Sequence, residues 1–132
     1  PVFADIYEQL LNYLYQKQHW TEERKIKINL DFKRYTKTEL IRIFVEQGGN
    51  IEEAFTSSFS CYSPEGGKEC WSCKPCFRKF IAFALNGYPF TEEVVARNIT
   101  YIKREVLPLI ESGYYGRKQE EEEIKQVLSI YK

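Results

Sequence analysis

The sequence predicts an α/β fold that is mostly helical. Several segments repeat apolar residues at spacings of three and four, which is the period of an amphipathic helix. One segment, residues 25–32, alternates polar and apolar residues instead, as a strand with one buried face does. The chain has 132 residues, of which 43% are hydrophobic and 29% charged, so one globular domain with a modest core is expected.

The N-terminal part predicts a helix followed by a strand. The helix covers residues 2–18 and the strand residues 25–32. A helix that leads into a strand is typical of the edge of an α/β fold. The apolar face of the helix consists of Phe3, Ile6, Tyr7, Leu10, Leu11 and Leu14, and that of the strand of Ile26, Ile28, Leu30 and Phe32.

Capping patterns predict the next two helical segments. In the sequence Thr36-Lys-Thr-Glu39 the threonine hydroxyl can accept a hydrogen bond from the backbone of Glu39, whose carboxylate reaches back to the cap. A helix therefore starts at about Lys37, and the two glycines at residues 48–49 end it. Residues 50–53, Asn-Ile-Glu-Glu, repeat this pattern and predict a short helical turn.

Three further helices are predicted in the C-terminal half. The first runs from Cys76 to Gly87. Thr91 caps the second, which Pro108 is expected to kink or break because proline lacks a backbone N–H. The third follows the acidic run of residues 120–123, which is expected to be a solvated face.

All four cysteines of the chain lie together as Cys61-x8-Cys70-x2-Cys73-x2-Cys76. The two short spacings let three thiolates point into one turn of backbone, and the loop with the turn sequence Ser-Pro-Glu-Gly-Gly returns the fourth. We interpret the pattern as a four-cysteine zinc site. Four thiolates leave no open position for water, so the ion is expected to be structural and not catalytic.

Two alternatives use the same cysteines and remain open with less weight. Two disulfides are disfavoured because an x2 spacing rarely suits a structural bridge and nothing indicates secretion. An iron–sulfur cluster is disfavoured because Phe77 follows Cys76 where a ferredoxin run continues to a further Cys-Pro. His19, the only histidine, lies far away in sequence and is expected to be an ordinary surface residue.

The charge of the site also needs compensation. Zinc with four thiolates carries a formal charge of about −2, which cations or backbone N–H groups must offset. Cys76 lies at the predicted start of a helix, where the helix dipole favours a thiolate. The cations expected to help are Lys68, Lys74, Arg78 and Lys79.

Composition limits the partners. The formal net charge is +0, with 19 basic and 19 acidic residues, which disfavours duplex nucleic acid and anionic membranes as partners. The apolar runs are too short to cross a bilayer and no secretory signal opens the chain, so a cytoplasmic location is expected. Aromatic residues reach 16%, which favours a core or an interface.

Several motifs of the chain resemble one known family. They are Phe59-Ser60-Cys61-Tyr62, the Cys70-x2-Cys73-x2-Cys76 run, Ala82-Phe83, Gly87 and, upstream, the segment from Ile28 to Thr36-Lys37-Thr38-Glu39-Leu40-Ile41 and the start Pro1-Val2-Phe3. Together they closely resemble the C-terminal part of the 7-cyano-7-deazaguanine synthases, the QueC-type enzymes of queuosine biosynthesis. The resemblance covers roughly the first ninety residues.

This resemblance implies a fold and a chemistry. The family belongs to the PP-loop ATPases, α/β proteins of the adenine nucleotide alpha hydrolase type. Its members use ATP and ammonia to convert 7-carboxy-7-deazaguanine into the nitrile, and they hold a structural zinc with four cysteines. By resemblance, Cys61, Cys70, Cys73 and Cys76 are the zinc ligands here. The candidates for substrate contact are Ser60, Tyr62, Trp71, Arg78 and Lys79, and no catalytic residue is assigned.

The chain departs from the family in several places. The Ser-Gly-Gly-x-Asp-Ser loop that cradles pyrophosphate is missing from these residues, so ATP is expected only with a PP-loop-bearing partner or N-terminal part. Lys79 replaces an arginine, and Trp71 replaces a glycine. Trp71 is interpreted either as a stacking platform for a deazapurine or, preferably, as a lid packed over the metal loop. Ser60 and Tyr62 have an equal alternative in core packing or hydrogen bonds to thiolates.

The leading hypothesis is the zinc-bearing C-terminal portion or subunit of a QueC-like ligase, inactive alone. Residues 1–90 form that portion, with the zinc loop at 59–78, and residues 91–132 form a helical extension. One alternative is a non-enzymatic, zinc-stapled module that binds a protein partner. Another is a degenerate relative in nucleic-acid modification or defence. Homo-oligomers are compatible with each hypothesis.

Overall fold

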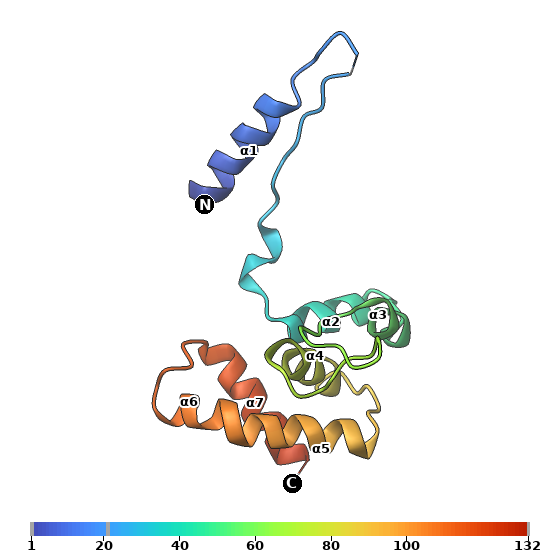
Figure 1. Ribbon diagram of the computed structural model, residues 1–132, viewed down its shortest axis with the longest axis vertical. Coiled ribbons are helices and arrows are strands. Elements are labelled where there is room, and N and C mark those ends of the chain that lie inside the picture. Colours follow the sequence, from blue (N-terminus) through green and yellow to red (C-terminus); the bar gives the residue numbers. More distant parts are fainter. Residues whose placement is uncertain (1, 21, 132) are drawn as a thin grey trace. The chain divides into compact units, whose positions relative to one another are not determined.

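The computed structural model describes residues 2–20 and 22–131 and confirms that the chain is mostly helical (Figure 1). None of the described helices is long and apolar enough to cross a membrane. The α-helices are α1 (Val2–Leu14), α2 (Lys37–Glu46), α3 (Ile51–Ser57), α4 (Lys74–Ala84), α5 (Glu92–Tyr101), α6 (Leu107–Glu111) and α7 (Lys118–Ile130), with a 3₁₀ turn η1 (Asp31–Arg34) and a π-helical segment η2 (Ile102–Val106).

The chain divides into two compact units, residues 1–34 and residues 35–132. The first unit contains α1, the extended segment after it and η1. The second unit contains all other helices and the four cysteines.

The predicted strand at residues 25–32 does not form within the described part of the chain, where the segment is extended and ends in η1. Its backbone pairs with side chains of α1 instead of a neighbouring strand. The Asn12 side chain accepts from Ile26 N at 2.8 Å and donates to Ile26 O at 2.7 Å. The Glu8 carboxylate accepts from Ile28 N at 2.7 Å. The strand prediction was wrong because a strand needs a backbone partner, which the alternating pattern cannot supply.

The predicted caps of α2 and α3 are present. Thr36 Oγ1 accepts from Glu39 N at 3.1 Å while Glu39 Oε2 accepts from Thr36 N at 2.6 Å, so the capping box is complete. Gly48, with φ of +89°, follows the end of α2 in the left-handed conformation that glycine adopts freely. Asn50 Oδ1 accepts from the first turn of α3. These caps fix where α2 and α3 begin within the second unit.

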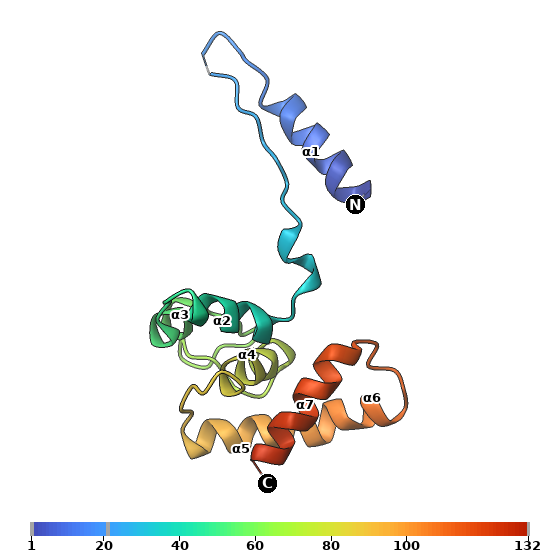
Figure 2. The ribbon, with the colours of Figure 1, turned by 180° about the vertical axis from the view of Figure 1, so that it is seen from behind.

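Helix α4 is the centre of the core in the second unit. Its side chains pack against those of η2 and α7. Figure 2 shows α4 among the helices of this unit. The helix is apolar on nearly all sides, which is typical of a helix surrounded by others. The buried core consists of Phe77, Phe80, Ile81 and Ala84 from α4, Ile102 and Val106 from η2, and Ile124 and Val127 from α7.

Pro108 neither breaks the chain nor ends the helix. Helices α5, η2 and α6 follow one another without a gap, and Pro108 lies in the first turn of α6. The turn before it is widened: Leu107 N bonds to Ile102 O, a π-helical contact. A π-turn lets the helix accommodate a proline ring that would otherwise meet the preceding turn. The expected kink or break is therefore replaced by a local widening.

The acidic run of residues 120–123 is only in part a solvated face. Glu120 accepts hydrogen bonds from Arg78 at 2.8 Å, from Tyr115 at 2.9 Å and from Arg117 at 2.8 Å. Glu123 accepts from Thr36 Oγ1 at 2.6 Å. Burial acts to raise the pKa of Glu120, but the donors Arg117 and Tyr115 and the charge of Arg78 lower it below its ordinary value. The run thus joins α7 to α2 and α4.

We expect Glu120→Gln to lower the free energy of unfolding by about 1–3 kcal/mol, because it weakens bonds to two arginines and a tyrosine. The stabilisation by Glu120 is complete above its ordinary pKa of 4.5 and is lost as the pH falls through the lower pKa of the folded state. The difference from wild type should therefore shrink towards acid pH in urea denaturation. Glu122→Gln is the control, since Glu122 is exposed and pairs with Lys125 at 2.9 Å. Equal effects of both variants on the free energy of unfolding would contradict a stabilising role of the Glu120 hydrogen bonds.

Candidate metal centre

The four cysteines converge in the second unit. The Sγ atoms of Cys61, Cys70, Cys73 and Cys76 all lie within 4.8 Å of one another. A tetrahedral site with zinc–sulfur distances of about 2.3 Å places its sulfurs about 3.8 Å apart. The cluster therefore fits a metal ion with little movement, and four thiolates are the donor set of closed structural zinc sites.

A tight turn brings Cys61 back to the other ligands. Glu65 N donates to Lys68 O at 2.9 Å and Lys68 N donates to Glu65 O at 3.0 Å, which closes a two-residue hairpin. The two central residues, Gly66 and Gly67, have φ of +58° and +79°. Positive φ at both positions is the requirement of this hairpin turn, and glycine meets it without strain. The turn predicted from Ser-Pro-Glu-Gly-Gly is confirmed.

The other three cysteines surround the start of α4. Cys73 is the N-cap residue, Pro75 lies in the first turn and Cys76 follows it. The helix thus begins two residues earlier than the predicted start at Cys76, at Lys74. Proline at this position is compatible with a helix start, because its missing N–H is not needed there. Both Cys73 and Cys76 lie at the end of the helix where the dipole favours negative charge.

Backbone N–H groups donate to one sulfur of the cluster. Ser63 N donates to Cys61 Sγ at 3.3 Å and Cys70 N donates to the same sulfur at 3.4 Å. Arg78 instead bonds to Glu120, and the Lys79 ammonium bonds to a carboxylate and two carbonyl groups. The expected charge balance by Arg78 and Lys79 is therefore replaced by backbone donors, which stabilise thiolates in metal sites.

The thiols differ in acidity. Although burial alone would raise the pKa of Cys70, hydrogen bonds from Ser72 and the neighbouring thiols lower it to about 7. Burial raises the pKa of Cys61, and burial together with Cys73 and Cys61 raises that of Cys76. Four sulfurs this close cannot all be anionic without a cation. A divalent ion must therefore displace protons when it binds.

A buried ion pair between Lys79 and Glu69 connects two segments of the metal loop, the one before Cys61 and the one before Cys70. Lys79 and Glu69 are 4% and 8% exposed, and Lys79 Nζ lies 2.8 Å from Glu69 Oε2. The same ammonium donates to Phe55 O at 3.1 Å and to Ser58 O at 2.5 Å, and it lies 4.3 Å from the centroid of the Phe55 ring. Glu69 Oε1 accepts from Ser60 N at 2.7 Å. One ion pair thus joins α4, the end of α3 and the two segments of chain that carry Cys61 and Cys70.

The sequence motifs did not indicate a role for Glu69. A lysine on the apolar helix that follows the cysteines could have indicated it, since such a lysine is rarely buried without an acidic partner. The acidic residue next to Cys70 supplies that partner.

Trp71 lies in an aromatic cluster under the loop. Its ring is parallel to that of Phe55, with centroids 5.9 Å apart and an angle of 7°. The ring of Phe90 meets it edge-on at 5.7 Å. Trp71 has φ of +54°, in the left-handed region that glycine favours. The glycine expected here from the family resemblance would adopt this φ without strain. In this structure the Trp71 ring is packed against other aromatic rings, as in the second interpretation given above.

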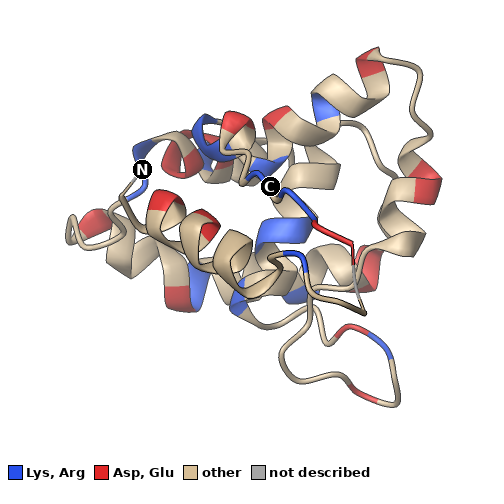
Figure 3. Ribbon diagram, turned by 90° about the horizontal axis from the view of Figure 1, so that it is seen from above, with Lys and Arg blue, Asp and Glu red and all other residues tan. Residues whose placement is uncertain are grey.

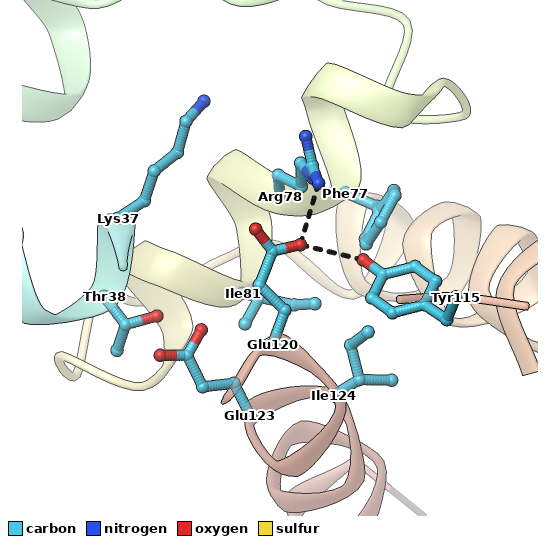
Figure 4. A pocket seen from close by; sticks show the side chains of 9 residues that line it. All are labelled: Lys37, Thr38, Phe77, Arg78, Ile81, Tyr115, Glu120, Glu123 and Ile124. Atoms are coloured by element: carbon cyan, nitrogen blue, oxygen red, sulfur yellow. Dashed lines mark hydrogen bonds and ion pairs between the residues drawn. The ribbon is translucent and has the colours of Figure 1, made fainter. Parts of the chain in front are cut away.

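The other candidates for substrate contact are not brought into one cavity. Tyr62 is 81% exposed, whereas Ser60 is half-buried next to Glu69. Arg78 lines a small pocket between α2, α4 and α7, with Lys37, Thr38, Tyr115 and Glu120 among the other lining residues (Figure 4). The volume of about 20 Å³ has room for about one water molecule. Contact of these residues with a substrate stays a prediction.

The surroundings of the site do not favour anions. An open pocket of about 390 Å³ lies beside the metal loop, lined by Ser72, Arg97 and Arg104 among others. Arg97 pairs with Glu93 and Arg104 pairs with Glu105, so neither arginine is free of a carboxylate. Figure 3 shows basic and acidic segments interspersed on the helices. His19 is exposed in the first unit, against Trp20, as expected for a surface residue.

Replacing Lys79 by methionine should lower the free energy of unfolding by about 3–5 kcal/mol, because Glu69 would remain buried without its partner. The double variant Lys79→Met with Glu69→Leu should recover part of this loss. Urea denaturation of the metal-loaded chain measures both. Lys74→Met, at an exposed position of the same helix, is the matched control. A loss no larger than that of the control would show that the ion pair is not needed.

Metal binding should strengthen as the pH rises. The raised pKa values of Cys61 and Cys76 keep these thiols protonated at neutral pH, and an ion must compete with their protons. Titration of the reduced chain with Zn²⁺ in buffers of different ionisation enthalpy would measure both affinity and proton release. Tighter binding at pH 8 than at pH 6.5, with protons released, is the expected result. Cys73→Ser should abolish tight binding, and a pH-independent affinity would contradict this picture.

The comparisons with known proteins agree with the position of the cluster. The family model described as queuosine biosynthesis protein QueC matches residues 1–87, which include α1 to α4 and all four cysteines. No curated protein and no solved structure matches the chain. The match covers well over half of the 132 residues, and it ends just after α4, the helix whose start carries Cys73 and Cys76. The chain therefore belongs to the QueC family of queuosine biosynthesis proteins.

Proposed function

We propose that this chain is the zinc-bearing part of a QueC-like, ATP-dependent ligase. The ligase makes 7-cyano-7-deazaguanine from 7-carboxy-7-deazaguanine and ammonia. The observation that carries the proposal is the four-cysteine cluster inside the segment that matches the QueC family. A PP-loop-bearing partner subunit, or a PP-loop-bearing part of the same protein, supplies the nucleotide site in this proposal.

Zinc is the metal that the donor set favours. The four sulfurs are close enough for one tetrahedral ion, and Cys61 accepts two backbone hydrogen bonds, as a metal-bound thiolate does. With four protein ligands the ion has no open position and acts as a staple of the loop. Its contribution is to folding, and the chemistry of the reaction lies elsewhere. A reducing cytoplasm would keep the thiols available for the ion.

ATP is needed because the oxygen of an acid or an amide is a poor leaving group. In the proposed reaction ATP activates first the carboxylate, so that ammonia can form the amide, and then the amide oxygen, whose loss leaves the nitrile. These residues contain no Ser-Gly-Gly-x-Asp-Ser sequence to cradle pyrophosphate. The chain alone is therefore proposed to be inactive.

The first unit supplies the surface proposed for the partner. Helix α1 exposes an apolar face, with Phe3 at 78%, Ile6 at 60% and Leu10 at 49% exposure. The extended segment turns the backbone of Ile26 and Ile28 towards α1. On the opposite edge, the backbone N–H and C=O groups of the residues in between have no hydrogen-bond partner among the described residues. Bare edges and apolar faces favour pairing with another chain, and a strand of the partner's sheet would complete the α/β fold.

The proposal is tested by mixing the zinc-loaded chain with a QueC-type protein that has a PP-loop but lacks the cysteine loop. We expect ATP-dependent formation of the nitrile from 7-carboxy-7-deazaguanine and ammonia, and mass spectrometry measures this product. The chain alone and the partner alone are the controls. No nitrile with any such partner, although each protein is folded, would overturn the proposal.

Leu10→Glu should reduce nitrile formation by the mixture about tenfold or more, because a buried charge at an apolar interface weakens association by at least about 1.4 kcal/mol. Gln9→Glu, at an exposed polar position of the same helix, is the matched control. Zinc binding should be the same in both variants, since α1 and the cysteines belong to different units. Sedimentation of the mixture measures the association directly. Equal association of both variants would contradict a contact through this face.

A further inference from the structure

The segment between Cys70 and Cys73 is the most strained part of the metal loop. Trp71 has φ of +54°, and it is the only non-glycine residue with a positive φ among residues 2–20 and 22–131. A bulky side chain in the left-handed region costs free energy and persists only where the surroundings hold it. Two cysteines of the cluster depend on this turn, because it sets the direction of the chain between them.

Arg97, on α5, contacts this segment from outside the family match. Its Nη1 atom donates to Cys70 O at 3.3 Å and lies 3.6 Å from Glu65 Oε2, in the hairpin of the loop. Its Nη2 atom lies 3.0 Å from Glu93 Oε1, one helical turn earlier on α5. The planar guanidinium thus joins the two arms of the loop to α5, which a flexible ammonium would do less well.

Phe90 packs against the ring of Trp71. Its ring meets that of Trp71 at 5.7 Å, nearly perpendicular, and also packs on Phe80 of the core at 4.9 Å. Phe55, which lies in the family-matched segment, stacks on the indole at 5.9 Å, and its ring lies 5.6 Å from that of Phe90. The indole therefore packs in one cluster with a residue of the matched segment and a residue that follows it.

The hydrogen bond of Arg97, and not its charge, distinguishes it from the other basic residues near the site, because Glu65 and Glu93 both pair with its guanidinium. Arg78 and Lys79 are bonded to Glu120 and Glu69. In the described part of the chain, Arg97 is the basic side chain whose hydrogen bond reaches the backbone of a cysteine of the cluster.

We propose that the chain after residue 87 is part of the metal site, with Arg97 of α5 as a positioning residue and Phe90, just before α5, as the support of Trp71. Both residues keep the strained turn between Cys70 and Cys73 in the shape that the metal requires. The inference goes beyond the proposed ligase function, because it concerns the metal loop alone and needs neither ATP nor a partner.

The first test compares Arg97→Ala with Arg104→Ala in the full chain. Arg104 lies two turns further along, is 71% exposed and pairs with its neighbour Glu105, so it is the matched control. Competition with a chelator measures the affinity for Zn²⁺, and Co²⁺ in place of zinc reports the geometry of the thiolates through its absorption spectrum. We expect Arg97→Ala to lower the zinc affinity by about ten- to a hundredfold and to alter the cobalt spectrum. Arg97→Lys should restore part of the affinity, and Arg104→Ala should change neither.

The second test separates the support of Trp71 from general stability. Phe90→Leu should weaken zinc binding in the wild-type chain but much less in a Trp71→Gly background, because glycine adopts a positive φ without support. An equal effect of Phe90→Leu in both backgrounds would overturn the role of Phe90. A zinc affinity of Arg97→Ala within twofold of wild type, or an equal loss in Arg104→Ala, would overturn the role of Arg97. The comparison of Phe90→Leu in the wild-type and Trp71→Gly backgrounds tests the proposal even where Arg97→Ala is poorly folded.

Discussion

The buried ion pair between Lys79 and Glu69 joins the helical core to the metal loop. Lys79 belongs to α4, the helix around which the core of the second unit is packed, whereas Glu69 belongs to the loop. The ammonium also binds carbonyl groups at the end of α3, and Glu69 binds the backbone just before Cys61. Because both charges are almost fully buried, each depends on the other. The positions of both arms of the cysteine loop therefore follow from one contact.

Helix α4 connects the two chemically different sides of the second unit. Its start carries Cys73 and Cys76, and its body is enclosed by η2 and α7. The family match ends just after this helix, yet the helices that follow bury its apolar surface. These helices therefore stabilise α4 of the matched segment. The metal loop, in turn, is held by the ion pair and by contacts of α5.

Local patterns predicted the parts of the structure that depend on neighbouring residues. The capping box at Thr36, the hairpin at Gly66 and the cysteine cluster all formed as expected, since caps, turns and short ligand spacings are decided within a few residues. The strand at residues 25–32 was wrong because its partner must come from elsewhere. The solvated acidic run was wrong in part because Arg78 and Thr36, far away in sequence, bind Glu120 and Glu123.

The sequence by itself determined the helical character of the chain, the cluster of four cysteines and the relation to the QueC family, since periodicity, spacing and motif are properties of the linear chain. The tertiary structure alone decided which charges meet. Lys79 pairs with Glu69 and not with the thiolates, and Arg97 reaches the loop from a helix beyond the family match. The physical reason is that the energy of a charge depends on its burial and on partners brought close by packing, and neither is written in local sequence.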